Sequence, residues 1–238
     1  MLTAVAWFLF ACALATAGWL WRERRRLQRR LDDAELRRLR TQLNPHFLYN
    51  TLNAVSELGY NDPKTADEVV TQLSLLLRKC LDDVHQNEIA LRDEVVFLER
   101  YLGIQKILLR DRLQYALAFD EGTLNARVPG MIVQPLAENA LTHGAGVDGG
   151  VELRVASVRD GDSLVVTVED RGPGLRGEES GPGRGIGLAN IHARLRRLYG
   201  DAARLTLQPR PGGGLMAQLV VPYHEGFAYR EAARPDRR

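Results

Sequence analysis

The stretch RGPGLRGEESGPGRGIG, residues 171–187, holds seven of the chain's 22 glycines. Glycine tolerates positive φ angles and lets backbone amides approach an anion closely, and residues 186–199 have the pattern of a helix whose N-terminus would face that anion. The GxGxG at 183–187 lacks the lysine of a P-loop and does not directly follow a strand, which excludes both familiar glycine fingerprints. The stretch predicts a lid over phosphate groups, although a plain surface loop would have the same composition.

The sequence on both sides of this stretch has the patterns of strands and helices. Residues 159–162 (RDGD) and 211–214 (PGGG) are turn sequences between alternating segments, which predicts two β-hairpins. The predicted strands span 113–119, 151–158, 164–169, 205–207 and 215–221, and the predicted helices span 132–143 and 186–199. Antiparallel strands with segregated helices indicate an α+β fold, here a two-layer sandwich of about a hundred residues.

Two positions in this predicted sandwich suit a nucleotide and its metal. Asp170 ends a strand beside Gly172 and Gly174, where its carboxylate could accept a hydrogen bond from the exocyclic amine of a flat ring, although a turn aspartate would be equally ordinary. Glu138 and Asn139 are adjacent on a helix, and such a pair suits Mg²⁺, which takes few protein ligands beside phosphate oxygens and water. Without other motifs, this pair would more often be solvated surface.

Helical patterns fill the first half of the chain. One runs through residues 22–60, and the Asn44-Pro45 pair either kinks this helix or restarts it. After Asn61-Asp62-Pro63, a second pattern runs through residues 69–84 and a third through 95–109, each apolar on one side and short of partners within the chain. A two-helix hairpin cannot enclose its own core, so we expect two copies of the chain to pair in a four-helix bundle.

The first 40 residues predict a membrane anchor. Residues 2–21 carry no charge and as a helix would span about 30 Å, the thickness of a bilayer core. The nine arginines and four acids of residues 22–40 follow this run, which predicts a single-pass protein of the inner (cytoplasmic) membrane with its N-terminus outside. The alternative is a cleaved signal peptide, with Ala13-Leu14-Ala15 as the cleavage site.

The charge distribution also limits the function. The net charge of +2 combines a segment of +5 at residues 22–40 with a remainder of about −3. This distribution excludes a uniformly basic protein that coats nucleic acid, and we expect no direct binding to nucleic acid.

Three motifs in the predicted sandwich together carry a resemblance that none carries alone. PLAENA at 135–140, Asp170-x-Gly172-x-Gly174 and Gly183-x-Gly185-x-Gly187-Leu188 resemble the N box and the two glycine boxes of the gyrase and histidine-kinase ATP-binding superfamily. Upstream, LRTQLNPHFLYNTLN at 39–53 is similar to the phosphoacceptor box of LytS-like sensor histidine kinases. LERYL at 98–102 and GLANI at 187–191 also fit that family.

The resemblance implies a two-component sensor histidine kinase. ATP with Mg²⁺ would phosphorylate His46, and the phosphoryl group would pass to an aspartate of a response regulator, commonly a LytTR-type transcription factor. Asn139 would hold Mg²⁺, Asp170 would bind the adenine amine, and the lid from Gly172 to Gly187 would close over the triphosphate. The further positions implied to bind the cofactor are His143, Gly174, Gly183, Arg184, Gly185 and Leu188.

The resemblance leaves the proton acceptor open. Phosphoryl transfer depends on placement and on charge neutralisation at the γ-phosphate, in part from Arg184, more than on activation of His46. Many histidine kinases place an acid just after the histidine, whereas Phe47 follows here. Glu138 is therefore a candidate base, and Asn50, one turn on, is a candidate for orienting the ring.

We expect five parts along the chain: a transmembrane anchor at 1–21, a basic signalling helix at 22–40, a helical dimerisation and phosphoacceptor region at 41–110, an ATP-binding domain at 111–225 and a tail at 226–238. A hinge at 109–112 would let His46 reach an ATP held in the other domain. The sequence leaves open whether phosphorylation occurs within one subunit or across the dimer. It also leaves open the signal, the identity of the regulator, the need for a separate sensor subunit and the presence of phosphatase activity.

Two other functions fit parts of the sequence. One is a degenerate kinase that binds ATP and regulates through dimerisation, although such decay usually removes one of the motif residues. The other is a clamp-type ATPase in which Glu138 activates water, a function that leaves the residues around His46 unexplained.

Overall fold

The computed structural model describes residues 45–82, 87–146, 149–174, 186–210 and 212–226. The predicted membrane anchor at 1–21, the basic helix at 22–40 and nearly all of the tail at 226–238 lie outside these ranges. The chain divides into two compact units, residues 1–49 and 50–238. Among the described residues, no helix is both long enough and apolar enough to cross a bilayer.

Two consecutive helices, α2 (Pro45–Asn61) and α3 (Pro63–Asp82), are separated by Asp62 alone. The Asp62 carboxylate caps α3, because it accepts hydrogen bonds from the Thr65 amide at 3.2 Å and the Thr65 hydroxyl at 2.6 Å. These bonds hold the pKa of Asp62 below its ordinary value. Pro63 occupies the first helical position, where no amide hydrogen is needed. The predicted helix after Asn61-Asp62-Pro63 is confirmed.

Helix α4 (Leu91–Leu109) is not short of partners, and that part of the prediction is wrong. It packs against α3, and also against helix α5 (Gln134–His143) and strand β2 (Leu113–Phe119) of the sandwich. The sequence pattern shows which residues of α4 are apolar but not that a segment far along the chain covers them. Its buried residues are Leu91, Glu94, Phe97, Leu98, Tyr101, Leu102 and Ile104.

The predicted hinge at 109–112 is a short turn within packed structure. Residues Arg110–Arg112 form the 3₁₀ helix η2, in which Arg110 has a φ of 54°. Across this turn, the Lys106 ammonium donates a hydrogen bond to the carbonyl of Leu113. Leu113 itself is a fully buried residue. The helix before the turn and the strand after it are packed together, and a hinge at this position remains a prediction. The domain boundary between residues 110 and 111 remains a prediction.

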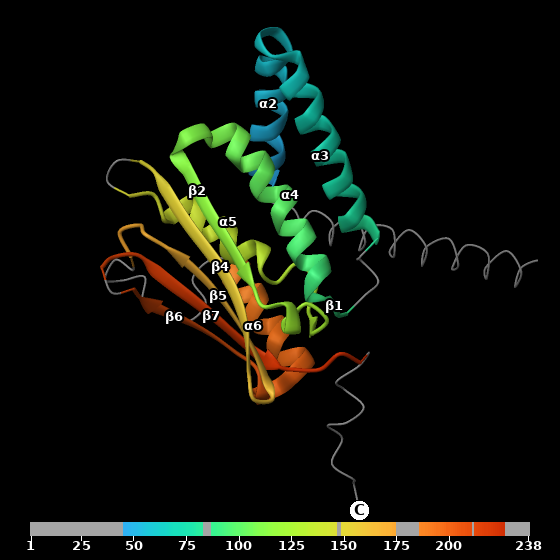
Figure 1. Ribbon diagram of the computed structural model, residues 1–238, viewed down its shortest axis with the longest axis vertical. Coiled ribbons are helices and arrows are strands. Elements are labelled where there is room, and N and C mark those ends of the chain that lie inside the picture. The colour runs from blue at the N-terminus through green and yellow to red at the C-terminus, as the bar shows by residue number, and fades with distance from the viewer. Residues whose placement is uncertain (1–44, 83–86, 147–148, 175–185, 211, 227–238) are drawn as a thin grey trace, which may run out of the picture. The chain divides into compact units, whose positions relative to one another are not determined.

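A five-stranded sheet forms one layer of the sandwich (Figure 1). Helices α5 and α6 (Ile186–Tyr199) pack on one of its faces. Along β5 (Ser163–Asp170), fully buried side chains alternate with half-buried ones, because only one face meets the helices. The predicted α+β two-layer sandwich is confirmed. The strand order is β2-β4-β5-β7-β6, with β4 at Val151–Asp160, β6 at Arg204–Pro209 and β7 at Leu215–Pro222.

Both predicted hairpins are present. Strands β4 and β5 pair antiparallel, and Gly161 in their turn has a φ of 58°, a conformation that glycine adopts without steric penalty. Strands β6 and β7 also pair antiparallel, and β5 joins the two hairpins by pairing with β7.

Strand β2 corrects the prediction that the strands are antiparallel. It runs parallel to β4, with Leu113 opposite Val151 and Phe119 opposite Ser157. The connection between these strands contains α5, and a crossover of this kind joins parallel neighbours. A second, two-stranded sheet that the sequence patterns did not predict pairs β1 (Ile89–Ala90) with β3 (Arg127–Val128).

Candidate functional site

Asp170 lies at the C-terminal end of β5, with 6 % of its surface exposed. Its Oδ1 atom accepts hydrogen bonds from the backbone amides of Gly172 at 2.8 Å and Leu215 at 3.2 Å. Two bonds to one oxygen fix the orientation of the carboxylate. Neither of them uses Oδ2, which can therefore accept a hydrogen bond from a ligand.

Three glycines let the backbone close around Asp170. A Cβ atom on Gly144 would lie 2.7 Å from the Asp170 Cβ, and one on Gly214 would lie 2.8 Å from the Asp170 carbonyl carbon. A Cβ on Gly172 would lie 2.7 Å from the carbonyl carbon of Gly144. Such approaches are shorter than any ordinary packing distance between carbon atoms, so glycine is required at all three positions.

Two of these glycines, Gly144 and Gly214, were missed from the sequence. Gly144 directly follows the predicted helix and Gly214 ends the PGGG turn, so each position is explained by its local role in capping a helix or turning the chain. Only the tertiary structure shows that both glycines also make room for Asp170.

A small pocket adjoins Asp170 between the helices and the sheet. Asn139 and Asp170 are its polar residues, and the rest of its lining is apolar. Apolar walls with a few fixed polar groups are the kind of lining that binds a flat heteroaromatic ring with a hydrogen-bond donor, but the space enclosed here, about 20 Å³, holds about one water molecule, so a ring would enter only after the lining moves. The structure therefore brings together Asp170, Asn139 and Leu188, which the motifs singled out. The lining residues are Leu136, Asn139, Ala140, Val168, Asp170, Leu188, Leu207, Leu215 and Ala217.

Glu138 lies beside Asn139 on α5 and is half-buried. The side-chain amide of Gln134 donates a hydrogen bond to its Oε1 atom at 2.8 Å. Burial raises the pKa of Glu138, and the bond from Gln134 opposes this rise. Burial and the nearby charge of Glu138 also raise the pKa of Tyr101 on α4. A carboxyl with a raised pKa keeps its proton to a higher pH than an ordinary carboxyl, which suits it to proton exchange.

Gln134 was not predicted as part of the site. The available signal was its position four residues before Glu138, because side chains with this spacing are neighbours on a helix. Tyr101 gave no such signal, since it reaches the neighbourhood of Glu138 through the packing of α4 on α5.

The other residues predicted for the ATP site are less enclosed. His143 is exposed at the C-terminal end of α5, and Gly187 is exposed in the first turn of α6. Gly174 has a φ of 72° and is half-buried. The predicted residues Gly183, Arg184 and Gly185 lie outside the described residues.

His46 and Asn50 lie four residues apart on α2, and both are exposed. His46 belongs to the unit of residues 1–49, whereas the pocket around Asp170 belongs to the unit of residues 50–238. An exposed imidazole on a helix is accessible to a phosphoryl donor and to a phosphoryl acceptor, as a phosphoacceptor must be.

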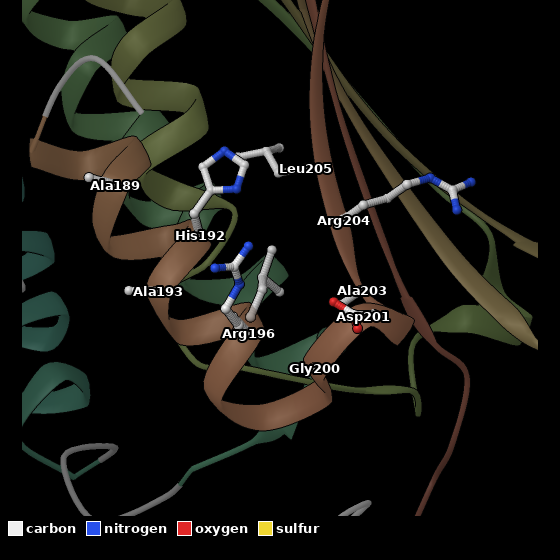
Figure 2. A pocket seen from close by; sticks show the side chains of 10 residues that line it. Ala189, His192, Ala193, Arg196, Gly200, Asp201, Ala203, Arg204 and Leu205 are labelled. Carbon is white, nitrogen blue, oxygen red and sulfur yellow. The ribbon is translucent and has the colours of Figure 1, made fainter. Parts of the chain in front are cut away.

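A wider hollow lies between α6 and β6 (Figure 2). His192 and Arg196 from α6 and Leu205 from β6 line it, together with small residues such as Ala189 and Gly200. Of the motif residues it contains Ala189 of GLANI, and it contains none of the residues predicted to bind the nucleotide or to react. The smaller pocket is the better candidate for nucleotide binding, because it combines a fixed carboxylate with apolar walls.

Residues 34–113 match the family described as Histidine kinase, and residues 125–225 match the family described as Histidine kinase-, DNA gyrase B-, and HSP90-like ATPase. Together the two matches span most of the chain. The chain belongs to the histidine kinase family. The second match contains every lining residue of the small pocket in this histidine kinase, and the first contains His46 and Asn50.

Several sensor histidine kinases are similar to this chain. Sensor histidine kinase YesM of Bacillus subtilis is 31% identical over 196 residues, which cover 81% of this chain and 34% of YesM. Sensor histidine kinase YpdA of Escherichia coli is 33% identical over 187 residues, 75% of this chain and 33% of YpdA. Sensor protein LytS of Staphylococcus saprophyticus is 32% identical over 205 residues, 82% of this chain and 34% of LytS. The predicted resemblance is confirmed, and the chain spans about a third of the length of these relatives.

Proposed function

We propose that this histidine kinase transfers the γ-phosphoryl group of ATP to His46, and from His46 to an aspartate of a response regulator. The observation that carries the proposal is the pocket around Asp170, in a chain whose residues 34–113 also match the histidine kinase family. A clamp-type ATPase would need the pocket alone. Phosphorylation of His46 accounts for both parts of the chain.

Asp170 is proposed to select adenine. Its Oδ1 atom is held by the amides of Gly172 and Leu215, so Oδ2 would accept a hydrogen bond from the 6-amino group of the base. Apolar side chains such as Val168 and Leu188 would cover the faces of the ring. A base with a carbonyl oxygen at that position would place two acceptors against each other and would be rejected.

Asn139 is proposed to hold Mg²⁺ on the phosphates of ATP. Its carboxamide lines the pocket beside Glu138, and oxygen donors of this kind fit a hard cation. Within the described part of the chain, no three acidic, histidine or cysteine side chains cluster as a metal site. Mg²⁺ takes most of its ligands from phosphate and water, and it neutralises phosphate charge when bound.

Glu138 is proposed to accept the proton that His46 loses, and Asn50 is proposed to orient the imidazole. The bond from Gln134 occupies Oε1 of Glu138, which leaves its other oxygen for the proton. His143, Gly172, Gly174, Gly187 and Leu188 are proposed to contact the nucleotide, together with Gly183, Arg184 and Gly185 of the lid.

The kinase is proposed to act as a membrane-anchored homodimer. Helices α2 and α3 expose large apolar side chains that a second copy would cover, namely Leu52, Tyr60, Val70 and Leu75. Residues 1–21 would anchor the dimer, with the catalytic part in the cytoplasm. A LytTR-type response regulator is the proposed phosphoryl acceptor, by analogy with the LytS relatives.

The test is phosphorylation of the purified full chain with γ-labelled ATP and Mg²⁺. The protein should acquire a label that is stable to base and labile to acid, and His46→Gln should abolish it. His192→Gln, a half-exposed histidine on α6, is the matched control and should keep the label. Hydrolysis of ATP by a wild-type chain that never carries label would favour the ATPase instead.

A further inference from the structure

The N-terminus of α5 is capped by a side chain from another helix. Val133 occupies the N-cap position and makes no side-chain capping bond. The Glu94 carboxylate of α4 instead accepts hydrogen bonds from three backbone amides, those of Met131 at 2.6 Å, Val133 at 2.8 Å and Gln134 at 3.3 Å. It thereby satisfies amides that have no partner within a helix, and it lies at the positive end of the helix dipole.

The loop before α5 is shaped around this carboxylate. Met131 has a φ of 55°, in the left-handed region that residues with a side chain rarely adopt. Glu94 is 1 % exposed. Burial raises its pKa, and the bonds from the three amides and the charge of Arg194 oppose this rise by stabilising the carboxylate. A strained loop that points its amides at a buried carboxylate indicates that Glu94 determines the conformation of the loop.

Helix α6 holds the same loop from another direction. The Arg194 guanidinium donates a hydrogen bond to the carbonyl of Gly130, the residue just before Met131. It also donates to the carbonyl of Asn87 at 3.4 Å. The loop between β3 and α5 is therefore fixed by one side chain from α4 and one from α6.

The two polar residues of the pocket have separate supports. Asp170 is held by the Gly172 and Leu215 amides, which belong to the sheet and its loops. Asn139 lies on α5, whose N-terminus is held by Glu94. A change at Glu94 would therefore move the Asn139 side of the pocket while leaving the hydrogen bonds of Asp170 in place.

We propose that Glu94 is a positioning residue for the nucleotide site, which fixes α5 to α4 and so places Asn139 relative to Asp170. The inference rests on the proposed function in that Asn139 is taken as the residue that holds Mg²⁺. Side chains that orient a metal-binding residue commonly affect metal affinity about tenfold or more. Loss of Glu94 should therefore weaken the contribution of Mg²⁺ to nucleotide binding more than the binding of the base.

The test is calorimetric titration of the purified full chain with ATP and with ADP, each with and without Mg²⁺. Glu94→Gln keeps the size of the side chain but replaces one acceptor oxygen with an NH₂ group. This group is a donor, and it would face the backbone amides that now donate to Glu94. It should reduce the Mg²⁺-dependent gain in ATP affinity about tenfold, while the affinity for Mg²⁺-free ADP changes little. Glu99→Gln, an exposed position on the same helix, is the control and should leave both values unchanged.

An unchanged Mg²⁺-dependent gain in Glu94→Gln would overturn the inference, and so would an equal loss of affinity with and without Mg²⁺. If Glu94→Gln does not fold, Arg194→Gln is measured in its place, and it should reduce the same gain because it releases the loop at Gly130. An unchanged gain in Arg194→Gln would then overturn the inference. Failure of the wild-type chain to bind ATP would instead overturn the proposed function.

Discussion

The side-chain amide of Gln134 donates a hydrogen bond to Glu138 from one turn earlier on α5, with 2.8 Å between Nε2 and Oε1. Gln134 is 1 % exposed, and among the described residues its own Oε1 atom has no hydrogen-bond partner. A buried acceptor without a partner costs about 1–3 kcal/mol. Gln134 therefore leaves one buried atom without a partner, while its other polar atom holds a carboxylate beside the pocket. This arrangement is better explained if Gln134 orients Glu138 than if it stabilises the fold.

Replacement of this glutamine should change the pH dependence of phosphorylation. Gln134→Leu removes the bond that opposes the effect of burial, so the pKa of Glu138 should rise further. If Glu138 must be ionised to accept the proton of His46, activity is lost as the pH falls through this pKa. The variant should therefore lose activity at a higher pH than the wild type.

The measurement is the initial rate of His46 labelling in buffers from mildly acidic to mildly alkaline pH. Gln114→Leu, at an exposed position on β2, is the control. An acidic limb at the same pH in the wild type and in Gln134→Leu would show that Gln134 does not tune Glu138.

Glu138 should lower the stability of the fold at neutral pH. Its pKa in the folded chain is raised above the ordinary value of 4.5, so the charged form is less favourable in the folded than in the unfolded state. This penalty is complete above the raised pKa and disappears below the ordinary one. Glu138→Gln should therefore raise the unfolding temperature at neutral and alkaline pH, and the gain should shrink as the pH falls.

The same substitution should reduce His46 phosphorylation about a hundredfold or more, which is the usual contribution of a general base. Thermal unfolding over a series of pH values, together with the labelling rate, checks both effects. Glu99→Gln, which removes an exposed charge from α4, should show neither. A variant that is stabilised but fully active would remove Glu138 from the reaction.

Asp170 should control the choice of base. In Asp170→Asn the carbonyl oxygen can still accept the amides of Gly172 and Leu215, but the position of Oδ2 becomes a donor. Loss of one hydrogen bond to a charged group should weaken ATP binding about tenfold to a hundredfold. Inosine triphosphate lacks the amine, so the wild type should prefer ATP over it and the variant should lose that preference. Titration of both nucleotides against both proteins is the measurement. If Asp170→Asn still prefers ATP, Asp170 does not bind the amine.

The segments with a clear period were predicted well, because their patterns are local. The hairpin strands alternate along one buried face, and α6 begins and ends where its apolar period does. Asp170, Asn139 and Leu188 were found because their neighbours form motifs. The parallel pairing of β2 could not be found this way, since two hairpins give no information on how residues 120–150 cross the sheet.

The unpredicted parts of the site depend on contacts between distant segments. Glu94 lies in a helical pattern where an acid suggests an exposed face, yet it is buried because the loop before α5 supplies three amide donors. Gly144 has an ordinary role at the end of a helix, and only the packing of that helix end against Asp170 gives it a second one. No periodicity or spacing records such long-range contacts.

Two glycine-to-alanine changes should have opposite effects on the stability of this protein. Gly103 lies in the interior of α4, and a Cβ atom there would meet no atom within 4 Å. Glycine in a helix is less favourable than alanine, so Gly103→Ala should raise the free energy of unfolding by about 0.5–1 kcal/mol and leave ATP affinity unchanged. In Gly144→Ala, the new Cβ would lie 2.7 Å from the Cβ of Asp170, so the end of α5 and the strand must separate.

Gly144→Ala should therefore lower both the stability of the fold and the affinity for ATP, because the carboxylate that would bind adenine is displaced together with the backbone. Chemical denaturation and nucleotide titration of the two variants provide the comparison. Each variant adds the same methyl group, so a difference between them reports the space at each position. Equal ATP affinity in Gly144→Ala and Gly103→Ala would mean that the close approach of Gly144 to Asp170 is not needed for the nucleotide site.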